Sequence, residues 1–468
     1  MTIFTKKNLD YIDPVFLLKR IFFATLQCSS LIIFFGVLAK LLGSPAQVGE
    51  FSTFFTTAYF TSLILLAGQD RLIFILIPQL KASNQSSRSY LTFIFLALVI
   101  YSIILLAFIV SFSTFFKAET HPLLLGLCFS PFFVIYEFSQ SLLNAVGRPL
   151  LSRCMSIISL AIITLILIVS KSLLATHLEA TFVAYLSTIV YFIVGCLGLF
   201  LANSILLSQD NLKSDKSTGS ILAQISFGFY QSFLLLKHHK TNSHNIFNWL
   251  KKGIPLALAR MNDGLFSGAT GLLYFLGISP ETIAYFTVAS LLFEINTEIS
   301  VVIRNHLIPK ITSLLTSTED RQLSTSSRSQ LCAIVCCIWC VILCSTAIIV
   351  LISKPIFSLY GPDYAASFPM LLILLVLYFL THGWAINRAV LTLYDQFRFF
   401  LSRYQTYRTV STLILMPILV KLFGVYGVLF ALGVPTLLAS AVQLFRIKQH
   451  IGLNLLWCQK THNNLVLP

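Results

Sequence analysis

The sequence predicts an all-α, polytopic membrane protein with twelve transmembrane helices, arranged as two six-helix bundles related by a parallel repeat. Three observations lead to this prediction: the apolar composition, the recurring apolar runs, and a bias of basic residues toward alternate loops. Of the 468 residues, 57% are hydrophobic and only 10% are charged, whereas soluble domains average about 25% charged residues. The mean hydropathy of +0.86 agrees with a membrane protein.

Apolar runs of about 20 residues recur along the whole chain, and each is long enough to cross a bilayer as a helix. We expect twelve spans at about 21–40, 51–77, 90–112, 123–145, 154–170, 180–207, 253–275, 282–308, 329–352, 366–388, 399–420 and 424–446.

The distribution of lysine and arginine orients these spans. With a cytoplasmic N-terminus, 23 of the 32 basic residues lie in inner segments, five lie in outer segments, and four lie within or at the ends of spans. This is a steep positive-inside bias. It predicts a multi-pass protein of the cytoplasmic (inner) membrane with both termini in the cytoplasm. It also accounts for the net charge of +15 without a nucleic-acid partner.

The chain divides near its middle, and its halves resemble each other. "LLGSPAQVGEFST" (41–53) and "FLGISPETIAYFTV" (275–288) align with one gap, which pairs Pro45 with Pro280 and Phe51 with Phe286. Residues 221–236 are apolar but short for a span, so we expect an interfacial helix there. The predicted parts are an N-terminal bundle (1–207), a cytoplasmic linker (208–248), a C-terminal bundle (249–446) and a cytoplasmic tail (447–468).

Nine ionisable residues interrupt the predicted spans. The bases are Arg71, Arg260, Arg304 and Arg408, and the acids are Asp70, Glu137, Asp263, Glu294 and Glu298. A charge at the centre of a helix costs about 2.5–3.5 kcal/mol on insertion scales. Nine charges facing lipid would be prohibitive, so we expect these side chains to face one another, a watery cavity or the cytoplasmic interface.

Helical spacing places several of these charges on polar seams. The seam of the fourth span has Ser130, Glu137, Ser141, Asn144 and Arg148. That of the seventh has Arg260, Asp263, Ser267 and Thr270, and that of the eighth has Thr287, Ser290, Glu294, Glu298 and Asn305. Structural alternatives remain open. Arg71 and Arg304 could reach the interface by snorkelling, and Arg260 with Asp263 could form an ion pair within one helix.

The sequence does not predict an enzyme. It contains no Walker A motif, no HExxH, no paired CxxC and no GxSxG. We expect no catalytic residues and no cofactor. Cys332, Cys336, Cys340 and Cys344 recur every four residues, which suits the packing of one helix face better than a metal site.

Several segments together resemble the polysaccharide flippases, of which O-antigen flippases are the nearest members. They are "LLGSPAQVGEFS", "GQDRLIFILIP", "LKKGIPLALARMNDGLFSG", "LYGPDYAASFPMLLIL" and "KLFGVYGVLFALGVPTLL". These flippases belong to the multidrug, oligosaccharidyl-lipid and polysaccharide exporter (MOP) superfamily. The resemblance covers about residues 17–447 and lies in the order and spacing of degenerate motifs.

The resemblance implies two facing bundles, with the first two helices of each lining a central cavity. It implies a substrate made of an oligosaccharide on a polyprenyl diphosphate, transported between leaflets for surface polysaccharide synthesis. The four arginines would bind the diphosphate, and the five acids would carry a coupling H⁺ or Na⁺. The other expected partners are membrane lipid and a polysaccharide polymerase or glycosyltransferases, with the chain itself a monomer. The 208–248 linker is longer than this family leads us to expect.

Two other functions remain open from sequence. A multidrug antiporter of the same superfamily would bind organic cations in an acidic, aromatic cavity. A membrane-integral polysaccharide polymerase would carry its chemistry on large outer loops, and every predicted outer loop here is short.

Overall fold

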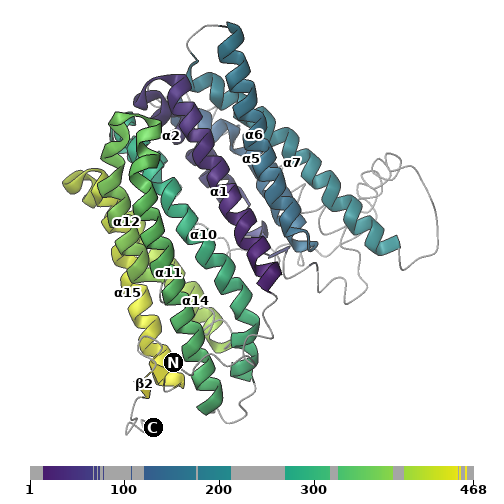
Figure 1. The fold of residues 1–468 in the computed structure, drawn as a ribbon, viewed down its shortest axis with the longest axis vertical. Coiled ribbons are helices and arrows are strands. Elements are labelled where there is room, and N and C mark those ends of the chain that lie inside the picture. Colours follow the sequence, from purple (N-terminus) through teal and green to yellow (C-terminus); the bar gives the residue numbers. More distant parts are fainter. Residues whose placement is uncertain are drawn as a thin grey trace. The chain divides into compact units, whose positions relative to one another are not determined.

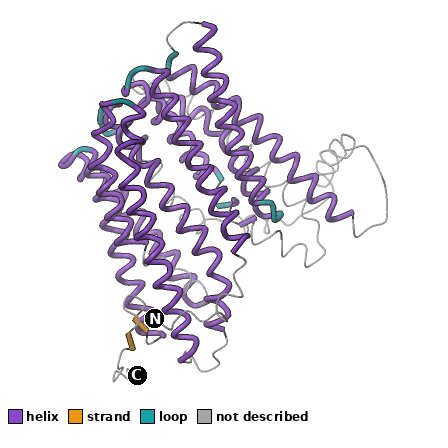
Figure 2. The backbone as a smooth tube through the Cα atoms, in the orientation of Figure 1, coloured by secondary structure: helices purple, strands orange, loops and turns teal. Residues whose placement is uncertain are grey.

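A computed structural model describes residues 14–66, 68–70, 72–73, 77, 107, 121–174, 178–211, 269–316, 325–382, 395–451, 453–454 and 459–460. Nearly all of these residues are helical (Figure 2), which confirms the all-α fold class. The long helices are α1 (Pro14–Leu42), α2 (Pro45–Leu65), α5 (His121–Ala145), α6 (Pro149–Leu174), α7 (Ala180–Asn211), α10 (Pro280–Thr316), α11 (Thr325–Tyr360), α12 (Ser367–His382), α14 (Asp395–Phe423) and α15 (Val425–Ile451).

Within the described ranges, nine helices are long and apolar enough to cross a membrane. Ten of the twelve predicted spans coincide with a described helix. The predicted span at 90–112, most of the one at 253–275, and the predicted interfacial helix at 221–236 lie outside the described residues. In the tail, α15 continues to Ile451, and Leu453–Asn454 (β1) pairs antiparallel with Gln459–Lys460 (β2).

Four helix junctions share a turn in which a glycine precedes a proline. Gly43, Gly147, Gly277 and Gly361 have φ values of 72°, 84°, 83° and 142°, and the next elements begin at Pro45, Pro149, Pro280 and Pro362. A left-handed glycine ends a helix, and the fixed φ of proline suits the first position of the next. The aligned motifs of the two halves therefore fold into the same kind of turn.

The chain forms two compact units. One comprises Met1–Gly49 with Leu276–Pro468, and the other comprises Glu50–Phe275. In the first unit, α10 packs against α1, α11 and α12, and Figure 1 shows α1, α10 and α11 running side by side. The Tyr360 hydroxyl at the end of α11 donates a hydrogen bond to the Ile32 carbonyl of α1, at 2.6 Å.

The second unit has an aromatic core between α2, α5 and α7. The Phe55 and Phe133 ring centroids lie 5.6 Å apart, and Tyr191 contacts both Phe133 at 5.1 Å and Tyr136 at 4.8 Å. Edge-to-face aromatic pairs of this kind contribute about 0.5–1.5 kcal/mol each beyond their buried area. Thr270, at the end of the predicted seventh span, joins this unit through a short hydrogen bond to Thr56 of α2.

Each unit therefore contains a segment from the other predicted half of the sequence: α1 lies with the C-terminal helices, and residues 269–275 lie with α2 and α5. The two compact units are defined by contacts within the structure. The predicted bundle limits at 207 and 249 are defined by the repeat in the sequence, and they stay a prediction.

Candidate functional site

The second predicted span is broken close to its acidic residue. A continuous helix over 51–77 was expected, and this was wrong: α2 ends at Leu65. Gly68 follows in the left-handed region with φ 76°. The Gln69 amide bonds the Leu66 carbonyl at 2.8 Å, and helical structure resumes at Gln69. A straight helix from Pro45 to Gly68 would rise ~35 Å, so the break lies near the end of the span opposite the α1–α2 turn.

The residues after the break are polar and buried. Gln69 and Asp70 each expose only 3% of their surface, between Leu66 and Leu72, which are also buried. Asp70 lies in the first turn of the resumed helix, where the helix dipole favours a negative charge by about 0.3–1 kcal/mol. An ionisable side chain buried in a transmembrane segment is by default a candidate functional site, and Asp70 meets this description. The neighbouring Arg71 lies outside the described residues.

We expect Gly68→Ala to reduce transport without preventing folding. An L-residue in the left-handed conformation costs about 1–2 kcal/mol, which would favour an unbroken helix and turn Asp70 away from its buried position. The measurement is the initial transport rate in proteoliposomes, with Ala58→Gly, a change at a buried helical site of α2, as the control for general loosening. A rate equal to that of the wild type would show that the break has no role.

A second polar site lies in the other compact unit, at Asn296 of α10. This side chain is fully buried. Its amide nitrogen donates to the Thr346 hydroxyl at 2.9 Å, its amide oxygen accepts a short hydrogen bond from Ser345, and its backbone carbonyl accepts one from the Tyr378 hydroxyl at 2.8 Å. The network ties α10 to α11 and α12. Sequence analysis missed it, because a single Asn in an apolar helix gives no spacing pattern.

The predicted acids of α10 lie on a different face from this network. Glu294 and Glu298 are half-buried, whereas Asn296, two residues from each, is fully buried. Two residues correspond to about 200° around a helix, so the two glutamates point away from α11 and α12. Thr287 and Ser290, predicted on the same seam, are buried, and their hydroxyls donate to carbonyls of their own helix at 2.8 Å and 2.7 Å. In this part of the seam, the hydroxyl groups therefore form hydrogen bonds within α10 itself.

The seam of α5 has a largely structural role in the described contacts. The Asn144 amide donates to the Ser152 hydroxyl of α6 at 3.3 Å, and Ser152 donates a short hydrogen bond to Gln140. Ser130 is buried and bonds the Leu127 carbonyl at 2.7 Å. Glu137 is half-buried beside this α5–α6 contact.

Three solved structures have a similar fold over nearly the whole chain. An inward-facing multidrug resistance MATE family transporter of the MOP superfamily matches with a TM-score of 0.61 at 14% identity, covering 94% of this chain and 96% of that one. The lipid II flippase MurJ, in an inward closed conformation, matches with a TM-score of 0.59 at 15% identity, covering 93% and 87%. A MOP superfamily transporter from Pyrococcus furiosus, described as having a binding pocket of reverse polarity, matches with 0.58 at 13%, covering 98% and 99%.

This chain has a MOP-transporter fold. At these identities the similarity extends to the fold alone, and it agrees with the predicted all-α membrane fold of two helical bundles. No family model matches the sequence, and no curated protein matches it either.

The remaining predicted residues are placed as follows. Arg408 is half-buried on α14. Arg260 and Asp263 lie outside the described residues, and Arg304 lies on α10 with its side chain outside them. No group of three His, Cys, Asp or Glu side chains within the described ranges could hold a metal ion. Of the cysteines recurring along α11, Cys336, Cys340 and Cys344 are exposed, as on a helix face toward lipid.

Proposed function

We propose that this protein is a flippase that moves a polyprenyl-diphosphate-linked oligosaccharide across the cytoplasmic membrane for surface polysaccharide synthesis. The observation that carries the proposal is the set of arginines at the second, seventh, eighth and eleventh predicted spans of a chain with the MOP fold. An anionic diphosphate suits guanidinium groups, which form charge-assisted, bidentate hydrogen bonds to phosphate. The fold is one that the lipid II flippase MurJ shares.

The proposed mechanism is alternating access between two bundles. Arg71, Arg260 and Arg304 bind the diphosphate while the lipid chain stays in the bilayer. Asp70, buried after the break at Gly68, and the half-buried Glu294 and Glu298 are the proposed carriers of a coupling H⁺ or Na⁺. Protonation and deprotonation of these carboxylates, or binding and release of Na⁺ by them, would drive the conformational change.

A multidrug antiporter is the second candidate, since a MATE family transporter shares the fold. The five acids in the spans favour it, because organic cations need carboxylates or aromatic rings. The four arginines oppose it, because cations in the cavity repel a cationic substrate. The two functions therefore differ in the sign of the substrate charge.

We expect Arg260→Ala to slow headgroup translocation in proteoliposomes at least tenfold, since a hydrogen bond to a charged group contributes about 1.5–3 kcal/mol. Glu294→Gln, which keeps the shape and removes the charge, should make translocation insensitive to an imposed ion gradient. Lys421→Ala removes an exposed cation at the end of α14 and serves as the control, with an unchanged rate. An unchanged rate in Arg260→Ala, or a rate that still depends on the gradient in Glu294→Gln, would contradict the role assigned to that residue.

A further inference from the structure

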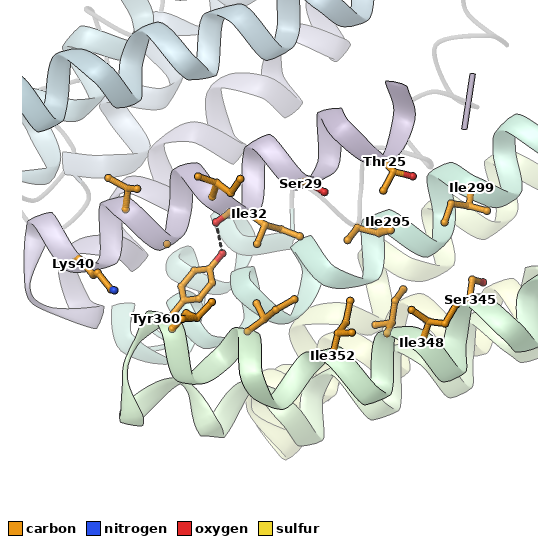
Figure 3. Close-up of a pocket in the computed structure, with 16 residues that line it drawn as sticks. Thr25, Ser29, Ile32, Lys40, Ile295, Ile299, Ser345, Ile348, Ile352 and Tyr360 are labelled. Atoms are coloured by element: carbon orange, nitrogen blue, oxygen red, sulfur yellow. Dashed lines mark hydrogen bonds between the residues drawn. The ribbon is translucent and has the colours of Figure 1, made fainter. Parts of the chain in front are cut away.

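An apolar groove runs between α1 and α11, with α10 beneath it (Figure 3). Its volume is about 580 Å³, and all of its lining residues belong to one compact unit. Ten of the sixteen lining residues are Ile, Leu or Val. Ile33 on one wall and Ile348 on the other are 61% and 56% exposed. The groove is therefore open along its side, toward the medium that surrounds α1 and α11 in the membrane.

Most polar groups lie toward the two ends of the groove, and Ser29 lies one turn of α1 in from Thr25. Lys40 and Tyr360 lie at one end, and Thr25 and Ser345 lie at the other (Figure 3). Lys40 is exposed and lies in the last turn of α1, at the interface where a lipid phosphate would be found. A single cation at the mouth of an apolar groove complements an anionic lipid.

The length of the groove distinguishes between lipids. It follows α1 from Thr25 to Lys40 and α11 from Ser345 to Tyr360, a separation of fifteen positions in each case, which corresponds to ~22 Å of helix. One leaflet of the hydrocarbon core is about 15 Å thick. An acyl chain anchored at the Lys40 end would reach the bilayer midplane, and the groove continues beyond it. A longer, continuous chain is needed to fill it.

We infer that this groove binds the polyprenyl chain of the lipid carrier, with Lys40 beside its diphosphate. The inference rests on the proposed flippase function and specifies it: the chain lies along α1 and α11 when the diphosphate is at the Lys40 end. By the orientation predicted from the basic residues this is the outer end, so the groove holds the carrier after its headgroup has crossed. The arginines proposed above then bind the diphosphate before and during translocation.

The test is photo-crosslinking of the purified protein in lipid nanodiscs to a polyprenyl diphosphate carrying a benzophenone in its isoprenoid chain. We expect labelled peptides from α1 and α11. Ile348→Trp and Ile33→Trp, which fill the groove from opposite walls, should each reduce labelling about fivefold or more. Leu343→Trp is the matched control, because Leu343 is 53% exposed on another face of α11 and does not line the groove. Lys40→Gln should reduce labelling about twofold to fivefold, the range expected for an exposed ion pair.

Two results would overturn the inference: labelling that falls equally in Leu343→Trp and Ile348→Trp, or displacement of the probe by phosphatidylglycerol as readily as by unlabelled polyprenyl diphosphate. Headgroup translocation, measured in sealed proteoliposomes made from the same purified protein, separates this inference from the proposed function. Translocation by the wild type without groove labelling rejects the groove alone. Absence of both translocation and labelling rejects the flippase proposal and the groove together.

Discussion

Gly49→Ala is expected to separate the start of α2 from the start of α10 and to reduce transport strongly. A Cβ atom at Gly49 would overlap the Pro280 carbonyl oxygen, because such carbon–oxygen contacts normally require about 3.3–3.6 Å. The obstacle is backbone at the start of α10, so no rotamer change relieves it. Overpacking costs about 1–3 kcal/mol, and the upper end of this range applies here.

A cost of about 3 kcal/mol shifts a conformational equilibrium roughly a hundredfold. We therefore expect the variant to favour states in which the start of α2 lies away from α10, and to lose most transport activity. The measurement is the distance between spin labels at Ser44→Cys and Ser279→Cys, in a background whose ten native cysteines are replaced by serine. The distance should lengthen in Gly49→Ala.

Gly36→Ala is the control for the distance measurement. A Cβ at Gly36 would lie 3.7 Å from the Tyr360 ring, which is an ordinary contact, so the distance between the spin labels should stay as in the wild type. A short distance and full activity in Gly49→Ala would show that this contact between α2 and α10 is not needed in the transport cycle.

Asn296→Leu is expected to destabilise the unit formed by α10, α11 and α12 by about 1–3 kcal/mol. The substitution removes the Asn296 amide that donates to the Thr346 hydroxyl, and it removes one of the two acceptors of the Ser345 hydroxyl, which also donates to the Ile342 carbonyl at 3.2 Å. Hydrogen bonds between membrane helices average only about 0.6 kcal/mol, but burying a polar group without a partner costs about 1–3 kcal/mol. The second effect dominates because Asn296 is fully buried.

The measurement for this variant is the thermal unfolding midpoint of the detergent-solubilised protein. Ser345→Ala, which removes one hydroxyl at the same network, should lower the midpoint less, and the double variant should lower it by less than the sum of the two. Additive effects would indicate that Asn296 and Ser345 do not act through a shared hydrogen bond.

The helices and their junctions were predictable because they depend on local signals. Apolar runs of membrane length and Gly–Pro turns, such as Gly277 before Pro280, appear directly in the sequence. The break at Gly68 was not predicted, because the apolar residues on both sides continue the hydrophobic pattern. The glycine in "LLAGQDR", just before three polar residues, was the available signal.

The polar sites, like the helices, include some that the sequence could predict and some that it could not. Periodicity found the half-buried Glu294 and Glu298, since repeated residues on one face form a pattern. It could not find the network at Asn296, whose partners Thr346 and Tyr378 come from two later helices. The apolar groove could not be predicted either, because its walls combine residues of α1 with residues of α11, about 300 positions later. Only tertiary packing brings them together.

The most direct test of the proposed function is headgroup translocation by the wild-type protein in proteoliposomes. Lipid-linked oligosaccharide is incorporated, and the fraction of its sugar that an added glycosidase can reach is followed over time, beside empty liposomes and beside transport of a cationic dye. The flippase proposal predicts rapid, protein-dependent translocation of the sugar and no transport of the dye. Dye transport with no movement of any lipid-linked sugar would contradict the proposal and would favour the cation antiporter.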